Sequence, residues 1–354
     1  MQLNHKQLEE TMKQFINGRM ALFIHGAPGI GKSDAVRKVA KETANNNKLL
    51  YTEDITDVNK EGKFLLIDIR ISQLDPTDLR GLPHIDNSVT KWVVPDWLPR
   101  KGNGILFFDE LNLAPPSIQA ACYQLILDKR LGDYMLPKGY SIIAAGNRLE
   151  DKANIFEMAA PLRNRFCHVE LAVPTVDDWV DWALKNDVDG RIIAFIKWRE
   201  PMLYKFDAKS SAHSFPTPRS WFFLSRLIRG VEDLGMVRIL ASSAVGDGTS
   251  IEFEAFTKLS RKFDLDELLS DPEKVKGVKE IDMKFAVVGG VSEKYRSNRK
   301  VLRSVLGLCE YLDPEYAILL LRMIRAIDEE KFVQNLVREK KWEKLSAKYA
   351  KYLQ

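Results

Sequence analysis

The sequence predicts an α/β domain with a parallel sheet, followed by helical segments, and three features support this prediction. Apolar runs alternate with helical patterns as far as residue 173, which is typical of three-layer α/β domains. An apolar run at 20–24 leads into a glycine-rich stretch at 26–33 and then into a helical pattern. After Pro174 the helical pattern continues alone. The expected parts are an α/β domain at 1–173, a helical lid at 174–270 and a helical C-terminal region at 271–354.

Length and composition limit the class of protein. The chain has 354 residues, of which 45% are hydrophobic and 29% charged, with a net charge of +4. No apolar run approaches the roughly 20 residues that cross a bilayer, and the polar N-terminus lacks the apolar core of a signal peptide. Three separated cysteines form no CxxC pair, which argues against disulfides and cysteine-rich metal sites. We therefore expect a cytoplasmic protein without membrane contact, and the small net charge does not by itself indicate nucleic acid.

The stretch GAPGIGKS at 26–33 carries the strongest chemical signal. Its glycines permit backbone conformations in which several N–H groups point at one anion. The helix that begins near Lys32 adds the positive end of its dipole, and Lys32 adds a charge for the β- and γ-phosphates. The hydroxyl of Ser33 can ligate Mg²⁺. The expected nucleotide-binding residues are Gly26, Ala27, Pro28, Gly29, Ile30, Gly31, Lys32, Ser33 and Asp34.

Two later apolar runs end in polar side chains. The run at 104–108 ends in Asp109 and Glu110, and the run at 141–146 ends in Asn147. The carboxyl ends of parallel strands meet at the edge of the sheet where ligands bind. Asp109 fits a contact to Mg²⁺, direct or through water, and Glu110 fits the base that polarises the attacking water. Asn147 could orient the same water or contact the γ-phosphate.

Several segments are less regular. Residues 71–100 are rich in Pro and Gly, so we expect a hairpin or loop insertion there, and a second hairpin over 130–140. Helical spacing predicts helices over 112–129 and 154–160. Thr175 is placed to cap the first helix after the α/β domain.

Five motifs, in this order, resemble those of the AAA+ ATPases. They are GAPGIGKS at 26–33, LFFDELN at 106–112, AAGN at 144–147, LRNRF at 162–166 and PTPRSW at 216–221. Their order and spacing carry the resemblance more than any single motif. Within this class the chain looks most like the MoxR branch and its dynein-related and phage-encoded relatives. The segment DLRGLP at 78–83 also looks like the insertion of MoxR-like proteins.

The resemblance implies a Mg²⁺-dependent ATPase with ATP as its nucleotide. It also implies a ring, usually of six copies, because an arginine finger reaches the γ-phosphate in the neighbouring subunit. The implied roles are a Walker B pair for Asp109 and Glu110, sensor 1 for Asn147, sensor 2 for Arg219, and the finger for Arg165 or, as the second choice, Arg163.

Two functions stay open at this point. The first is a chaperone-like ring that remodels a protein client, commonly with a von Willebrand factor A partner, since the sequence has no Asp-x-Ser-x-Ser run of its own. The second is a nucleic-acid motor of the McrB type, which the net charge and the lysine-rich end allow. The absence of a basic stripe with interleaved aromatics weakens it. A metabolite kinase does not explain the order of motifs, and an ABC-type ATPase requires an LSGGQ-like run that is absent.

Overall fold

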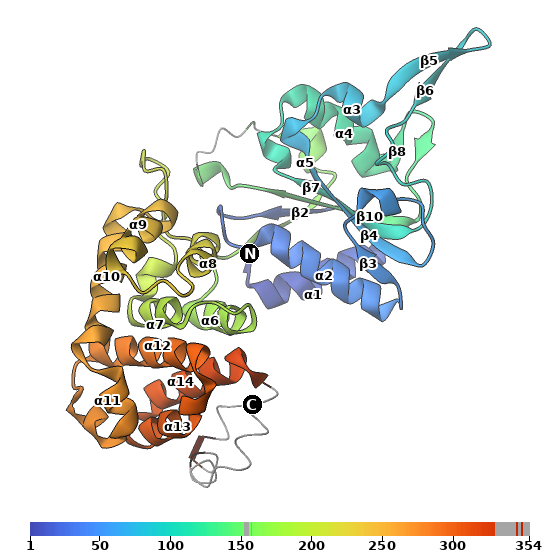
Figure 1. Cartoon of the computed structure of the whole chain (residues 1–354). Helices are drawn as coiled ribbons and strands as arrows, with labels where there is room; N and C mark the ends of the chain where they lie inside the picture. The colour runs from blue at the N-terminus through green and yellow to red at the C-terminus, as the bar shows by residue number, and fades with distance from the viewer. Residues whose placement is uncertain (152–155, 157, 330–344, 346–347, 350–354) are drawn as a thin grey trace. The chain divides into compact units, whose positions relative to one another are not determined.

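The computed structural model describes residues 1–151, 156, 158–329, 345, 348 and 349, and it forms two compact units (Figure 1). The first unit is Met1–Val173 and the second is Pro174–Gln354. The division falls at Pro174, where the alternation of strands and helices ends in the sequence. Each unit is described below by itself.

The first unit contains a seven-stranded sheet in the order β1-β11-β2-β10-β7-β4-β3, and every pair of neighbouring strands is parallel. This confirms the expected parallel sheet. The two shortest strands, β1 and β3, were not predicted because two or three residues give no readable periodicity. The strands are Gln2–Leu3 (β1), Leu22–His25 (β2), Leu50–Thr52 (β3), Lys63–Arg70 (β4), Asn103–Asp109 (β7), Gly139–Gly146 (β10) and Cys167–Leu171 (β11).

Helices cover both faces of the sheet, which explains why its central strands are apolar throughout. Helices α1 (His5–Gly18) and α2 (Lys32–Asn46) lie on one side, and α3 (Pro76–Arg80), α4 (Pro116–Asp128) and α5 (Ala160–Arg163) lie on the other (Figure 1). Alternate strand residues, such as Leu106 and Phe108 of β7, share one apolar cluster with Ile118 and Leu125 of α4. The three-layer arrangement expected from the sequence is therefore confirmed.

Strand β2 occupies the point where the strand order reverses. The chain leaves β2 for the edge strand β3, returns through β4, β7 and β10, and then places β11 on the other side of β2. In open parallel sheets, ligands bind beyond the carboxyl ends of the strands at such a point. The glycine-rich loop follows β2 directly, so the topology positions it where a ligand is expected.

The expected insertion at 71–100 forms α3 and an antiparallel hairpin, made of β5 (Leu82–Asp86) and β6 (Val89–Val93), that projects from the first unit (Figure 1). The second expected hairpin is a short one, with strands β8 (Arg130–Leu131) and β9 (Tyr134–Met135). Both hairpin predictions are confirmed.

Two predicted helices begin later than expected. The helix predicted from 112 starts at Pro116, after a 3-10 turn at Leu111–Leu113, because the prolines at 115 and 116 have no N–H for an earlier helical turn. Of the helix predicted over 154–160, residues 154, 155 and 157 lie outside the described residues, and the described helix α5 begins at Ala160.

The second unit is helical in its described residues, as expected. Thr175 caps its first helix by accepting a hydrogen bond from the N–H of Asp178 at 3.1 Å. Within the described part of both units, no helix is long and apolar enough to span a bilayer. The helix predicted over 330–353 lies almost entirely outside the described residues. The helices are α6 (Val176–Lys185), α7 (Gly190–Trp198), α8 (Pro218–Leu227), α9 (Leu234–Val245), α10 (Asp247–Leu259), α11 (Leu265–Ser270), α12 (Ile281–Ser297), α13 (Leu302–Tyr311) and α14 (Pro314–Ile327).

One apolar cluster runs through this unit from Trp179 to Ile324 and includes Phe253. The lid at 174–270 and the C-terminal region at 271–354, which the sequence analysis separated, therefore share a core. Glycine on α12 permits this, because a Cβ at Gly289 would lie 3.0 Å from the Cβ of Ala194 on α7.

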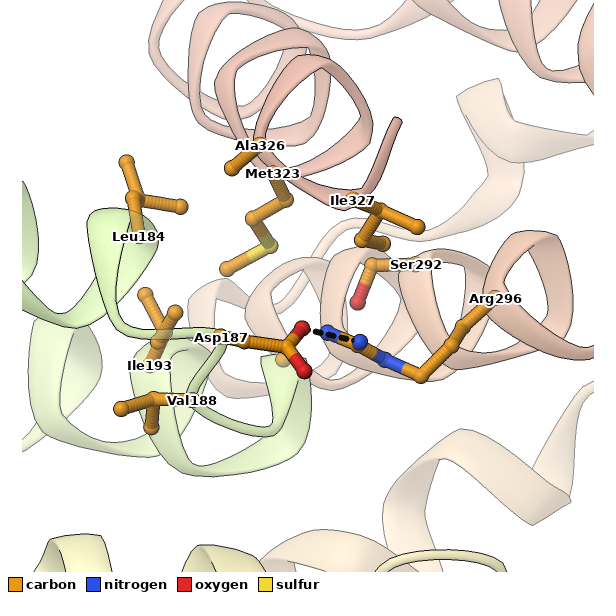
Figure 2. A pocket seen from close by; sticks show the side chains of 10 residues that line it. Leu184, Asp187, Val188, Ile193, Ser292, Arg296, Met323, Ala326 and Ile327 are labelled. Atoms are coloured by element: carbon orange, nitrogen blue, oxygen red, sulfur yellow. Dashed lines mark hydrogen bonds and ion pairs between the residues drawn. The ribbon is translucent and has the colours of Figure 1, made fainter. Parts of the chain in front are cut away.

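Charged residues reinforce the junction of α7 and α12. The guanidinium of Arg296 on α12 pairs with Asp187, which lies just before α7, beside a small hollow of about 10 Å³ (Figure 2). Glu293 accepts a hydrogen bond from the N–H of Gly190 at 2.8 Å, and burial raises the pKa of this carboxyl. These contacts tie the two halves of the helical unit together.

Candidate nucleotide-binding site

The glycine-rich loop between β2 and α2 has the backbone that an anion site requires. Gly29 and Gly31 have φ values of +73° and +94°, which side chains other than glycine rarely adopt. Gly31 occupies the N-cap position of α2 and brings no side chain to the first N–H groups of the helix. Those groups, together with the helix dipole, form an anion-binding site.

Lys32 lies inside this loop and is only 9% exposed. Its Nζ donates hydrogen bonds to the carbonyl oxygens of Gly26 at 2.7 Å and Ala27 at 3.0 Å, and to Oδ1 of Asn147 at 3.1 Å. The ammonium group thus contacts the end of β10 as well as its own loop. An incoming phosphate would offer this cation oxygen atoms in place of those acceptors.

Ser33 and Asp109 provide the oxygen atoms that a magnesium site requires. The hydroxyl of Ser33 donates to Oδ2 of Asp109 at 2.8 Å, although the two residues are 76 positions apart in sequence. Mg²⁺ is usually held by one or two protein oxygens, with phosphates and waters completing its shell. Among the described residues, no group of three or more His, Cys, Asp or Glu is placed to hold a metal. The donor set therefore fits Mg²⁺ bound together with a nucleotide.

Glu110 follows Asp109 but has different surroundings. Its φ is +57°, an uncommon value for a residue with a side chain, and its Oε2 lies 3.5 Å from the hydroxyl of Ser72. Asp109 accepts instead from Ser33 and from the N–H of Glu110. The two adjacent acids are therefore held by separate partners, which suits the two roles expected of them.

Asn112 was quoted in a motif, but the sequence analysis gave it no role. It is 5% exposed, and its Nδ2 donates to the backbone oxygen of Asn147 at 2.7 Å. A Cβ at Gly146 would lie 2.2 Å from Oδ1 of Asn112, so the glycine makes room for this amide. Asn112 thus connects the segment after β7 to the end of β10 and holds the backbone of Asn147 in place.

His5, on the first turn of α1, also contacts the loop and was not predicted. Its Nε2 lies 2.8 Å from the carbonyl oxygen of Ile30, and Asn4 caps the helix from which it projects. Nothing in the N-terminal sequence signals this contact, because it spans 25 positions. His5 supports the loop from the side of α1.

The two candidate finger arginines differ in their contacts. The guanidinium of Arg165 packs 3.6 Å from the ring centroid of Tyr123, and its Nη1 donates to the carbonyl oxygen of Pro161 at 2.6 Å. Its Nε is buried without a hydrogen-bond partner. The side chain of Arg163 is exposed, and its backbone oxygen accepts from Nε2 of His168 at 2.8 Å. Arg165 is therefore engaged within its own chain.

Arg219 belongs to the second unit. It is an exposed residue in the first turn of α8, where Thr217 and Ser220 form a capping box. Its role as a sensor of the nucleotide stays a prediction.

Comparisons with known proteins include distant similarities to three solved structures. No protein-family model and no curated protein matches the chain. A protein of Cytophaga hutchinsonii provisionally assigned as an ATPase is 13% identical, with a TM-score of 0.35 over 89% of this chain and 79% of its own. NtrX of Brucella abortus in complex with ATP is 15% identical, with a TM-score of 0.38. The match covers 83% of this chain and 64% of the NtrX chain. A DNA polymerase III gamma subunit-related protein of Thermotoga maritima is 12% identical, with a TM-score of 0.31, and the match covers 98% of both chains. Similarity this low assigns no function, so the interpretation depends on the geometry of the site.

Proposed function

We propose that this chain is an AAA+ ATPase that hydrolyses ATP with Mg²⁺. The observation that carries the proposal is a set of contacts at the carboxyl edge of the sheet. Lys32 contacts Asn147, and Ser33 contacts Asp109, so the glycine-rich loop, β7 and β10 meet at one place. Each of these residues was selected from sequence for a separate role in the same reaction, and their convergence supports that reaction.

In this proposal the start of α2 and Lys32 bind the β- and γ-phosphates. Ser33 and Asp109 would hold Mg²⁺, which neutralises phosphate charge when bound. Glu110 orients the attacking water and accepts its proton. Asn147, whose backbone is held by Asn112, would face the terminal phosphate and the same water. Phosphoryl transfer depends mainly on such positioning and electrostatic stabilisation.

The proposal also includes assembly of several copies, with an arginine acting in trans. For Arg165 this requires release from Tyr123 and Pro161. A cation–π contact and one hydrogen bond are together worth about 2 kcal/mol. A finger arginine accelerates hydrolysis by about 10³–10⁵-fold, which lowers the activation barrier by roughly 4–7 kcal/mol. This gain exceeds the free energy lost when Arg165 leaves its two contacts. Arg163 is the alternative, supported by its exposed side chain.

We further propose a protein client rather than nucleic acid. The hairpin of β5 and β6 exposes apolar side chains, with Leu82 at 63%, Ile85 at 74% and Trp92 at 47% exposure. Its charged residues include Asp86 and Lys91, which pair at 2.7 Å. Apolar side chains on a projecting element suit contact with protein, whereas nucleic-acid binding requires a basic surface. A von Willebrand factor A partner and a ring of six copies remain part of this proposal.

The proposal is tested by measuring ATP hydrolysis with and without Mg²⁺, and assembly size with ATP. Lys32→Ala should abolish nucleotide binding. Arg163→Ala and Arg165→Ala are each mixed with Glu110→Gln, and the finger is the residue whose variant regains hydrolysis in the mixture. Absence of hydrolysis by the unmodified chain would refute the ATPase. Stimulation by DNA or RNA that falls steeply with salt would favour the McrB-like alternative over a protein client.

A further inference from the structure

Two histidines from different strands form a hydrogen-bonded pair beside the glycine-rich loop. Nε2 of His25, the last residue of β2, lies 3.0 Å from Nδ1 of His168 on β11. The rings are stacked, with centroids 5.2 Å apart. Nε2 of His168 lies 2.8 Å from the backbone oxygen of Arg163. The three residues therefore form a continuous chain of hydrogen bonds from β2 to the turn after α5.

The direction of these hydrogen bonds follows from the acceptor at one end. A carbonyl oxygen can only accept, so Nε2 of His168 carries the proton that it donates to Arg163. In neutral His168 the other nitrogen, Nδ1, is then an acceptor, and Nε2 of His25 must donate to it. Burial, together with His168 and Lys32, lowers the pKa of His25 to about 4, so this ring is uncharged at neutral pH. One tautomer of each ring satisfies the whole chain.

The two ends of this chain of bonds lie in parts of the proposed machinery that act on different subunits. His25 directly precedes Gly26, whose carbonyl oxygen accepts from Lys32 in the nucleotide loop. At the other end, the turn over 163–165 carries both candidate finger arginines. In the proposed function, the first end would lie beside the nucleotide of its own chain, and the second would face a neighbouring copy.

The surroundings of the turn over 163–165 make its hydrogen bond from His168 important. A cavity of about 550 Å³ lies against it, and its lining includes His25, Asn147, Arg163, Phe166 and His168. A turn that borders a cavity of this size is held by fewer packing contacts than one in a filled core. The bond from His168 to the oxygen of Arg163 supplies a directional restraint that packing does not supply on that side.

We propose that His25 and His168 are positioning residues that tie the nucleotide loop to the turn carrying the trans-acting arginine. A displacement of the loop by nucleotide would pass through His25 and His168 to Arg163, so that the state of one site affects the arginine given to the next. This inference rests on the proposed ATPase function. It concerns two residues that neither motif nor spacing had selected.

The test replaces His168 with phenylalanine, which keeps a ring near Phe23 and Phe166 but removes both hydrogen bonds. We expect ATP affinity within about twofold of the unmodified chain, because the loop itself is intact, and a turnover number lower by about 10-fold. Mixing His168→Phe with Glu110→Gln should restore hydrolysis, because the Glu110→Gln chain offers a correctly held arginine to the intact loop of the His168→Phe chain. A purely structural defect in the loop would not be restored in this way.

Further variants sharpen the result. His25→Phe should lower the turnover number by the same factor. The double variant of His25 and His168 should turn over no more slowly than either single variant, because both substitutions break the same chain of hydrogen bonds. His213→Phe, at an exposed position before α8, is the matched control and should leave turnover unchanged. His168→Ala replaces His168→Phe if the larger ring prevents folding, with the same expected loss.

Three sets of outcomes overturn the link. Turnover of His168→Phe within twofold of the unmodified chain, or a loss that mixing does not restore, overturns it while leaving the ATPase proposal standing. An unmodified chain that does not hydrolyse ATP overturns the ATPase proposal and the link together. Multiplying losses in the double variant would show that the histidines act separately, which also contradicts the link.

Discussion

The contact between Lys32 and Asn147 predicts that Asn147→Ala separates nucleotide binding from turnover. The ammonium of Lys32 donates to Oδ1 of Asn147 at 3.1 Å. A phosphate must compete with this contact. A hydrogen bond of this kind, partly exposed and shared with two backbone acceptors, contributes about 1 kcal/mol net. Because a phosphate would take the place of Asn147 at the ammonium of Lys32, removal of this contact should tighten ADP binding by about fivefold.

ATP should respond differently, since the γ-phosphate is the proposed partner of the Asn147 side chain. We expect the turnover number of Asn147→Ala to fall by about 10–100-fold, as for the loss of one donor at a developing charge. Fluorescent ADP titration and single-turnover hydrolysis of ATP measure the two effects. Asn46→Ala, an exposed amide at the C-terminal end of α2, is the control and should change neither. Weaker ADP binding by Asn147→Ala would refute the reasoning.

Three further predictions follow from the site. Glu110→Gln should keep ATP affinity within a few-fold and lower single-turnover hydrolysis by about 10²–10⁴-fold, and normal hydrolysis would remove Glu110 as the base. Chelation of Mg²⁺ should abolish hydrolysis by the unmodified chain, and activity in excess chelator would argue against the Ser33 and Asp109 site. The folded chain binds a proton on His25 only near pH 4, below the ordinary pKa of 6.5, so this residue should weaken stability progressively as the pH falls from about 6.5 towards 4. The loss of folding stability should reach about 1 kcal/mol at pH 5 after allowance for partial exposure. Thermal unfolding measured at pH 7 and pH 5 should show this loss in the unmodified chain and not in His25→Phe. Equal pH dependence in both chains would contradict the lowered pKa of His25.

The sequence predicted the parts of the fold whose signals are local. The five longer strands, the glycine-rich loop, both hairpins and the cap at Thr175 are each specified by a few neighbouring residues. The two shortest strands were missed, because β1 and β3 form only through pairing with β11 and β4. The helix starts near 112 and 154 were placed too early or fall outside the described residues, because apolar spacing continues through turns that prolines or caps define.

The supporting residues of the candidate site were harder to predict. Asn112, Ser72 and His168 each act on a residue that is distant in sequence, so no window of sequence contains the interaction. Asn112 was within a quoted motif, and an amide two residues after the acidic pair Asp109 and Glu110 could have identified it. The histidines had no such signal, because a lone histidine on a strand is usually an ordinary packing residue.

Residue type and local order were enough to predict the chemistry of the glycine-rich loop and of the strand ends. Glycines, a lysine, a hydroxyl, paired acids and an amide can be assigned to phosphate and metal from their type and local order. The fold determines which of them meet, through a strand order that reverses at β2 and brings β7, β10 and the loop to one edge. It also decided that Arg165 packs on Tyr123, and that His25 and His168 join the loop to the arginine turn. These contacts depend on long-range register between strands, which residue type and spacing do not encode.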